Sequence, residues 1–112
     1  MKEIKAMIRP EMFETLYNNL RAEGYCCVTV YHGEGIGRHG DPDNLNASLE
    51  FPFLHSKITK LEILVADEQE KEVLNIIQQS ASTNHKGDGI VYSSAIDEAM
   101  SIRTGEGGEA VL

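Results

Sequence analysis

Residues 58–66 read Ile-Thr-Lys-Leu-Glu-Ile-Leu-Val-Ala and alternate between apolar and charged side chains. Leu61, Ile63 and Val65 share one face of the expected strand, because neighbouring residues of a strand point to opposite faces. Asp67 follows at once as a candidate helix N-cap, and an acidic residue three positions later completes a capping-box pattern. The stretch therefore predicts a half-buried strand that runs directly into a helix.

Apolar spacing predicts two amphipathic helices, one on each side of the Gly-rich middle of the chain. The first begins near Pro10, which suits the first helical turn, and ends near Gly24. The second follows Asp67. Their apolar stripes consist of Phe13, Leu16, Tyr17 and Leu20, and of Val73, Ile76, Ile77 and Ala81.

Further short segments complete the pattern. Residues 2–9, 26–31 and 90–92 predict strands, and residues 97–101 predict one helical turn. The order βαββαβ is that of the ferredoxin-like α+β fold, in which two helices cover one face of a four-stranded antiparallel sheet. We expect a homo-oligomer to cover the other face. The apolar residues expected on that other face are Met7, Ile90 and Tyr92.

Composition excludes several classes of partner. The 112 residues fit a single domain over residues 1–112. The formal net charge of −8 argues against nucleic acid and against anionic membrane surfaces. No apolar run approaches the ~20 residues that span a bilayer, and the N-terminal residues lack the apolar segment of a signal peptide. We expect a soluble, cytoplasmic protein.

The two cysteines, Cys26 and Cys27, are adjacent. Neighbours in a strand point to opposite faces, so we expect one buried thiol, one exposed thiol and no bond between them. Their spacing fits no zinc motif. The alternative is a metal site that combines either cysteine with histidines.

Three loops combine glycine with a cation. Gly35-Ile36-Gly37-Arg38 places two permissive backbones beside a guanidinium, which grips phosphate bidentately. Residues 83–89, Thr-Asn-His-Lys-Gly-Asp-Gly, form a turn of the kind that presents N–H groups to an anion. Residues 102–106, Ile-Arg-Thr-Gly-Glu, add a further arginine beside a glycine. Each loop alone fits an ordinary connection or a solvated tail, but together they favour a small ligand that carries phosphate.

The four histidines form no local metal-binding pair, and surface or structural roles are the simplest reading. His39 is the exception, because it follows the first glycine loop and is placed to contact a ligand or a metal. No Ser/His/Asp or Cys/His arrangement points to a nucleophilic site.

At these loops the sequence resembles the PII signal-transduction family, of the nitrogen-regulatory type, and the resemblance runs nearly end to end. Gly-Asp-Gly and Ile-Arg-Thr-Gly at this spacing are fairly specific as a pair. The segments that carry the resemblance are residues 2–10, 28–30, 35–38, 87–89 and 102–106.

The resemblance implies a homotrimer of ferredoxin-like subunits that bind an adenine nucleotide (ADP, AMP or ATP), with Mg²⁺ as a possible companion, in the clefts between subunits. The family has three named loops, which correspond here to a T-loop at about residues 37–55, a B-loop at about 82–90 and a C-loop at about 102–109. Family members respond to whether ATP or ADP is bound, and often also to 2-oxoglutarate. The bound ligand then changes the shape of the T-loop and so its binding to transporters, enzymes or transcription regulators.

The resemblance also assigns roles. Arg38 and Arg103 would grip phosphate, residues 87–89 would donate backbone N–H groups, and Thr29 with the third strand would hold the base. The expected nucleotide-binding residues are Thr29, Gly35, Gly37, Arg38, Glu62, Ile63, Leu64, Thr83, Gly87, Asp88, Gly89 and Arg103. The T-loop residues expected to bind a partner are Asn44, Leu45, Leu49, Phe51 and Phe53.

Departures from the family pattern change the expected ligands. Ile90 and Ser101 stand where the family carries a lysine and an arginine that face phosphate. Because charge-assisted hydrogen bonds contribute roughly 1.5–3 kcal/mol each, we expect ADP or AMP to be favoured over ATP, and a cyclic nucleotide remains an alternative. His39 and Ile58 replace the usual glutamine and lysine, so 2-oxoglutarate should bind weakly or not at all.

The T-loop departs as well. Phe51 stands where enteric relatives carry a modified tyrosine, so uridylylation at that position is chemically excluded. With Leu49, Phe53 and Leu54 it forms an apolar strip, which indicates contact with a partner. The alternative is that the strip packs on its own subunit.

We therefore predict a PII-like regulator, not an enzyme, that controls a transporter or a metabolic enzyme through its T-loop. One alternative is a PII-like regulator of inorganic carbon or metal transport instead of nitrogen. Another is a small ferredoxin-like enzyme acting on phosphates, with His39, His85 or Asp88 as its base.

Overall fold

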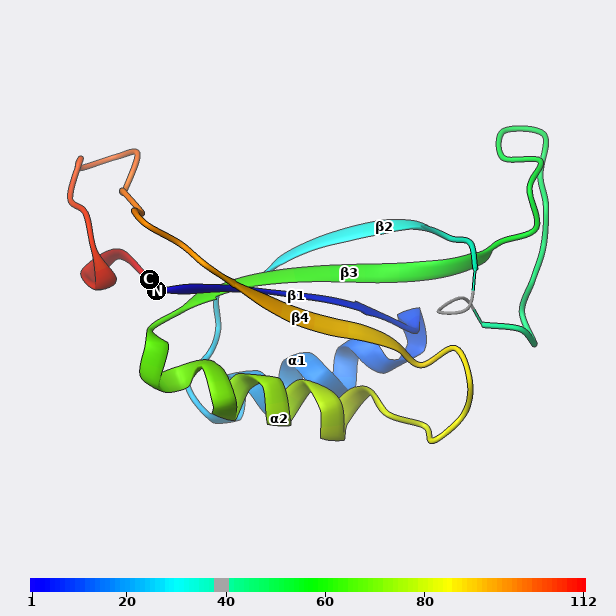
Figure 1. Cartoon of the computed structure of the whole chain (residues 1–112), viewed down its shortest axis with the longest axis horizontal. Coiled ribbons are helices and arrows are strands. Elements are labelled where there is room, and N and C mark those ends of the chain that lie inside the picture. Colours follow the sequence, from blue (N-terminus) through cyan, green and yellow to red (C-terminus); the bar gives the residue numbers. More distant parts are fainter. Residues whose placement is uncertain (38–40) are drawn as a thin grey trace.

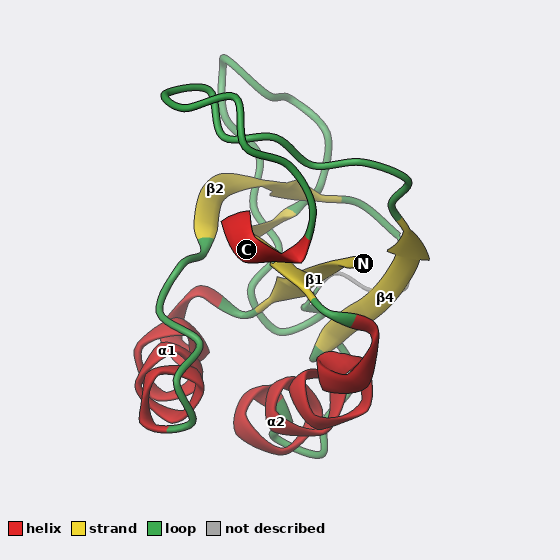
Figure 2. Ribbon diagram, turned by 90° about the vertical axis from the view of Figure 1, so that its left-hand side faces the viewer, coloured by secondary structure: helices red, strands yellow, loops and turns green. Residues whose placement is uncertain are grey.

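The computed structural model describes residues 1–37 and 41–112. Its four strands form one antiparallel sheet in the order β2-β3-β1-β4, and both α-helices lie on the same face of that sheet (Figure 1, Figure 2). This is the ferredoxin-like α+β fold that the element order predicts. The bounds are β1 (Lys2–Ile8), α1 (Phe13–Ala22), β2 (Thr29–Gly35), β3 (Ser56–Val65), α2 (Glu70–Ala81) and β4 (Gly89–Ala95). Short 3-10 turns cover Pro10–Met12, Asp67–Gln69 and Glu109–Val111.

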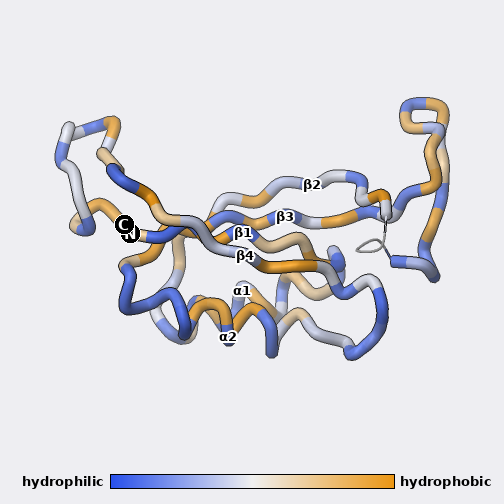
Figure 3. The backbone as a smooth tube through the Cα atoms, viewed as in Figure 1, coloured by the Kyte–Doolittle hydropathy of each residue, from blue (hydrophilic) through white to orange (hydrophobic). Residues whose placement is uncertain are grey.

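The core lies between the sheet and the two helices. Apolar and polar residues alternate along β1 and β3 (Figure 3). The apolar set is buried in one core cluster with residues of the two helices. Burying a large aliphatic side chain contributes roughly 1.5–3 kcal/mol, so this layer supplies most of the stability of the chain. The core residues below 2% exposure include Ile4, Leu16, Leu20, Leu61, Val65 and Val73.

β2 begins later than its sequence suggests. The expected strand covered residues 26–31, whereas the observed strand is Thr29–Gly35. Pairing with β3, from Thr29 opposite Glu62 to Gly35 opposite Ser56, sets these bounds. Tertiary pairing thus overrides the low strand propensity of glycine. Cys26 and Cys27 precede the strand and are both exposed, so the expectation of one buried thiol is wrong.

The start of α2 differs from the expected capping box. The side chain of Gln69, not an acidic residue, reaches back and accepts the N–H of Ala66 at 2.9 Å. Glu70, the residue expected in that role, accepts a hydrogen bond from the Ser93 hydroxyl at 2.6 Å and so ties the helix to β4. The predicted helix is correct, but its first turn is a 3-10 turn with a different capping contact.

No described α-helix covers the face of the sheet opposite α1 and α2 (Figure 2). Register places Met7 opposite Ile90 and Lys5 opposite Tyr92 on this face, which confirms their expected side. The large apolar side chains left partly exposed there are Tyr31, Leu64, Ile90 and Tyr92. Among the described helices, none has the length and apolar composition that crossing a membrane requires.

Candidate functional site

The predicted site residues lie at the two ends of the sheet. β2 holds seven residues, Thr29–Gly35, so its ends lie about 20 Å apart at roughly 3.3 Å per residue. The T-loop and the B-loop leave the sheet at the end that carries Gly35, whereas the C-loop lies at the end that carries Thr29 (Figure 1). A single chain therefore brings together only part of the predicted cleft.

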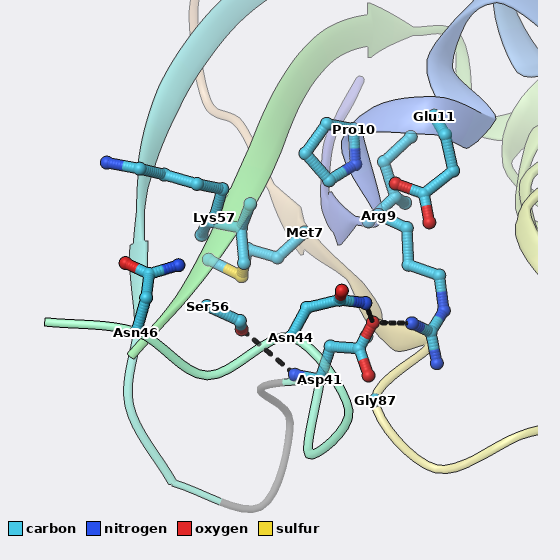
Figure 4. Close-up of a pocket in the computed structure, with 13 residues that line it drawn as sticks. Met7, Arg9, Pro10, Glu11, Asp41, Asn44, Asn46, Ser56, Lys57 and Gly87 are labelled. Atoms are coloured by element: carbon cyan, nitrogen blue, oxygen red, sulfur yellow. Dashed lines mark hydrogen bonds and ion pairs between the residues drawn. The ribbon is translucent and has the colours of Figure 1, made fainter. Parts of the chain in front are cut away.

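Arg9, directly after β1, joins the two loops at the first end. It is only 9% exposed. Its guanidinium forms an ion pair with Asp41 of the T-loop (Figure 4). The same group donates from Nε to Asp88 Oδ1 at 3.0 Å and from Nη2 to the Lys86 carbonyl at 2.7 Å, both in the B-loop. One buried cation thus ties the T-loop base and the B-loop to the end of β1.

Asp41 organises the base of the T-loop. Its N–H donates to the Ser56 hydroxyl at 2.9 Å (Figure 4), and its carboxylate accepts the Asn44 amide at 2.6 Å and the Asp43 N–H at 3.0 Å. The hydrogen bonds from Asn44 and Asp43, together with Arg9, lower the pKa of Asp41, so it stays ionised. Asn44, expected to contact a partner, therefore also has a structural role.

The carboxylate of Asp88 organises the B-loop. It accepts the Thr83 N–H at 2.8 Å, the Thr83 hydroxyl at 2.5 Å and the His85 N–H at 3.4 Å. Burial alone would raise the pKa of Asp88, but hydrogen bonds from Thr83 and Arg9 outweigh it and hold the pKa well below the usual range. The N–H groups of Gly87 and Asp88 have no hydrogen-bond partner among the described residues. Together with the N–H of Lys86, which likewise has no partner among the described residues, they are donors of this turn that remain available to an anion.

Gly89 begins β4 where the strand passes very close to β1. A Cβ at this position would lie 1.8 Å from the Met7 carbonyl oxygen, and the residue has φ +107°. Both the close approach and the left-handed backbone exclude any other residue. Gly89 is therefore required by the sheet itself, apart from any role in binding.

A cavity of about 270 Å³ opens between the T-loop base and the B-loop (Figure 4). Gly87 and Gly89, two predicted nucleotide-binding residues, line it. Its cations are already engaged: Arg9 pairs with two carboxylates, and Lys57 pairs with Glu34 at 2.7 Å. A phosphate bound here would need a further cation from elsewhere. The remaining lining residues are Met7, Ile8, Pro10, Glu11, Asp41, Asn44, Asn46, Ser56 and Ile58.

A second hollow, of about 260 Å³, lies at the other end of the sheet. Its walls combine apolar side chains with the polar side chains of Glu3, Thr29 and Glu62. The structure thus brings together the four residues that were expected to hold the base. The lining consists of Thr29, Glu62, Ile63 and Leu64, with Glu3, Cys27, Val111 and Leu112.

The C-loop is a compact turn. The helical turn expected over residues 97–101 is absent, and Met100 instead bridges to Gly107. Ser101 accepts the Gly105 N–H on its carbonyl at 2.8 Å and the Thr104 N–H on its hydroxyl at 3.3 Å. These local hydrogen bonds stabilise the turn, and the short helical pattern of residues 97–101 does not form a helix. Arg103 is exposed on the turn, where it is open to a neighbouring molecule.

The outer part of the T-loop is an arm whose two sides are joined by a single bridge. Asn46 and His55 exchange backbone hydrogen bonds of 2.8 and 2.9 Å, and Phe51 packs edge-on against the buried His55 ring at 4.8 Å between ring centres. Leu49 is fully exposed at the tip, and Phe53 is largely exposed. Phe51 therefore packs inside the arm, whereas the apolar side chains that point to solvent include Leu45, Leu49, Phe53 and Leu54.

The family model described as "Nitrogen regulatory protein P-II" matches residues 1–106 of this chain. The chain belongs to the P-II family. The predicted resemblance is thus confirmed, and the family is one of nitrogen-regulatory signal-transduction proteins.

Relatives span the whole chain. It is 39% identical to nitrogen regulatory protein P-II 2 of Methanothermobacter thermautotrophicus over 112 residues, 100% of this chain and 97% of that protein. It is 36% identical to the nitrogen fixation nifHD region GlnB-like protein 1 of Methanothermococcus thermolithotrophicus, with 96% and 99% covered. Identity to nitrogen regulatory protein GlnK of Escherichia coli is 30%, with both chains fully covered.

Two of the predicted site residues, Arg38 and His39, lie outside the described residues, so their roles toward phosphate or metal stay predictions. Within the described residues, no three histidine, cysteine, aspartate or glutamate side chains gather as metal ligands. Arg9 and Asp41, which organise the P-II loops, are not among the site residues that the sequence predicts. Nothing in the local pattern marks them, because their pairing depends on how the distant segments fold together.

Proposed function

We propose that this P-II protein is a homotrimer that binds an adenine nucleotide between subunits and reports the bound state through its T-loop. The observation that carries the proposal is the division of the predicted cleft between opposite ends of the sheet. Gly35 and the B-loop lie at one end, while Thr29, Glu62 and the C-loop lie at the other. Two neighbouring subunits arranged head to tail around a closed ring would unite these halves.

The uncovered sheet face supports the trimer. Its partly exposed apolar side chains, Tyr31, Leu64, Ile90 and Tyr92, lie on one continuous surface. Burial of such side chains is favourable by about 25 cal/mol per Å² of apolar area, and aromatic residues are typical of interfaces. Contact between these faces around a three-fold axis also places the ends of neighbouring sheets beside one another.

The chemistry of the two ends suits a nucleotide. The hollow at Thr29 and Glu62 offers apolar walls for a base and polar side chains for its edge, while the turn at residues 87–89 offers N–H groups to phosphate. The ligand proposed is ADP or AMP in preference to ATP. The reason is that the uncharged side chains of Ile90 and Ser101 supply no cation. Ile90 faces Met7 on the sheet, and Ser101 closes its own turn.

The engagement of Arg9 supports the proposal that 2-oxoglutarate binds weakly. A dicarboxylate needs an unpaired cation to offset its loss of hydration. Arg9 already forms ion pairs with Asp41 and Asp88, and Lys57 forms an ion pair with Glu34. Mg²⁺, if it accompanies the nucleotide, would have to be held mainly by phosphate and water, because both nearby carboxylates are engaged.

The T-loop is the proposed contact with a target protein, such as a transporter or metabolic enzyme. Leu49, Phe53 and Leu54 expose apolar side chains on an arm that extends from the body (Figure 1). The names of the relatives favour a nitrogen pathway over inorganic carbon or metal transport. Of the three candidate bases of the enzyme alternative, Asp88 is a poor one, because its hydrogen bonds and strongly lowered pKa make it a weak proton acceptor.

The test is calorimetry of the purified protein against ATP, ADP, AMP and cyclic AMP, with and without 2-oxoglutarate, combined with light scattering for oligomeric state. We expect a trimer, one nucleotide per subunit and tighter binding of ADP or AMP than of ATP. A monomer, or no heat with any nucleotide, would contradict the proposal.

A further inference from the structure

Cys26 and Cys27 lie side by side in the segment that joins α1 to β2. Because this segment is not part of a strand, the two side chains do not point to opposite faces. Their sulfur atoms lie 3.4 Å apart, and both residues are exposed. Cys27 also lines the hollow that contains Thr29 and Glu62. A pair of exposed thiols therefore borders the proposed base-binding site.

We propose that Cys26 and Cys27 are a reversible dithiol modification site, which closes to a disulfide within the chain by exchange with a small-molecule disulfide and thereby alters the hollow at Thr29. The effect on the ligand rests on the proposed nucleotide function, whereas disulfide formation does not.

The exchange balances in two steps. A thiolate of the pair attacks one sulfur of the small disulfide, forms a mixed disulfide and releases one thiolate. The second cysteine then loses its proton and attacks the cysteine sulfur of the mixed disulfide, which releases the second small thiol. Both cysteines are oxidised, the small disulfide receives the two electrons, and the protons of the cysteines end on the two released thiols.

The geometry favours both closure and reopening. The two sulfur atoms are already in contact at 3.4 Å, so the second cysteine can reach the mixed disulfide without a large movement of the chain. Adjacent Cα atoms lie about 3.8 Å apart, below the usual disulfide range of about 4.4–6.8 Å. A disulfide in so small a ring is strained and easily reduced, which is typical of regulatory disulfides.

Closure would reshape one wall of the hollow. Cys27 precedes Thr29 by two residues, and Thr29 is the first residue of β2. The two sulfur atoms are in contact but are farther apart than bonded sulfur atoms. Formation of the disulfide must therefore draw them together and rotate the backbone between the two cysteines. The Cys27 side chain would then leave its place beside Ile63 and Leu64, and the shape of the base-binding surface would change.

The native protein is incubated with oxidised glutathione, and its intact mass is measured, with Cys26→Ser and Cys27→Ser as matched variants. We expect the wild type to lose two hydrogen masses per chain without retaining glutathione. Each single variant should instead retain one glutathione at its remaining cysteine. Thermal melts check that the variants fold. Stable glutathione adducts on the wild type, disulfides between chains or no change in mass would overturn the proposal.

Calorimetry then compares nucleotide binding before and after treatment. We expect closure to weaken binding about tenfold, a difference of about 1.4 kcal/mol, and dithiothreitol to restore it. The double variant Cys26→Ser/Cys27→Ser should have the same Kd with and without oxidised glutathione. An unchanged Kd in the closed wild type would overturn the effect on the hollow. Absence of binding in the reduced protein would overturn the proposed function instead, and the mass measurement would still decide whether the dithiol closes.

Discussion

The guanidinium of Arg9 forms a buried ion pair with Asp41 and at the same time donates to Asp88. Asp41 belongs to the base of the T-loop, and Asp88 belongs to the B-loop. The B-loop, which was predicted to bind the ligand, and the T-loop, which was predicted to contact the target, thus share one cation at the end of β1. A ligand that disturbs the B-loop would therefore act on the T-loop through Arg9.

Replacing Arg9 by methionine should destabilise the protein and loosen both loops. Removal of one partner from a buried ion pair leaves the other charges uncompensated. We expect the Tm of Arg9→Met to fall by at least about 5 °C and the T-loop to be cut faster by a protease. Lys57→Met is the control, because it breaks the exposed pair with Glu34 and exposed pairs contribute little. Equal Tm values for the two variants would contradict the role of Arg9.

Asp88 should make stability depend on pH. Hydrogen bonds from Thr83 and Arg9 hold the pKa of Asp88 below its unfolded value of about 3.9. A lowered pKa in the folded state stabilises the protein above the unfolded pKa, and this contribution is lost as the pH falls through the folded pKa. Asp88→Asn should therefore lower the Tm by several degrees at pH 7.

The difference in the free energy of unfolding between wild type and Asp88→Asn should stay constant from about pH 7 to pH 5. It should shrink below about pH 4. Urea titrations at a series of pH values measure it. A difference that grows as the pH falls would show that the carboxylate is not stabilised by its partners.

Gly89→Ala should disrupt the pairing of β4 with β1. The new Cβ would meet the Met7 carbonyl, so the strands must separate. Gly105→Ala separates this effect from backbone strain, because Gly105 also has positive φ but no atom within 4 Å of its Cβ position. We expect a cost of about 1–2 kcal/mol for Gly105→Ala and a much larger loss for Gly89→Ala in urea unfolding. Similar losses would mean that the close approach is unimportant.

Phe51 and Leu49 should differ in what they contribute to the T-loop arm. Phe51 packs on His55, whereas Leu49 is fully exposed. An edge-on aromatic pair contributes about 0.5–1.5 kcal/mol, so Phe51→Ala should speed amide exchange at Asn46 and His55 about 2- to 10-fold. Leu49→Ser should leave exchange unchanged and weaken only contact with a target. Faster exchange in Leu49→Ser would place that side chain in the arm instead.

The sequence predicts the helices and β3 well, because their patterns are local. Leu61, Ile63 and Val65 alternate, and the helical stripes repeat at the spacing of a helix. β2 is less predictable, since Gly33 and Gly35 have low strand propensity and only pairing with β3 places them in a strand.

The candidate site is predictable by residue type but not by position. The glycine loops indicate a phosphate ligand, yet nothing local shows that the C-loop and the B-loop lie at opposite ends of the sheet. The contacts of Arg9 with Asp41 and Asp88 join segments far apart in the chain, so they appear only once the chain is folded.

The measurement that tests the central claim most directly is nucleotide stoichiometry in mixed trimers of two defective variants. Arg103→Ala should damage the C-loop end, and Arg38→Ala should damage the T-loop end, if the two arginines have their predicted roles toward phosphate. If each site uses opposite ends of neighbouring subunits, equal mixtures refolded together should regain about one intact site in four, the product of two even chances. Calorimetry should detect these tight sites only in the mixture. Trimers that form but regain no tight site would contradict a cleft shared between subunits.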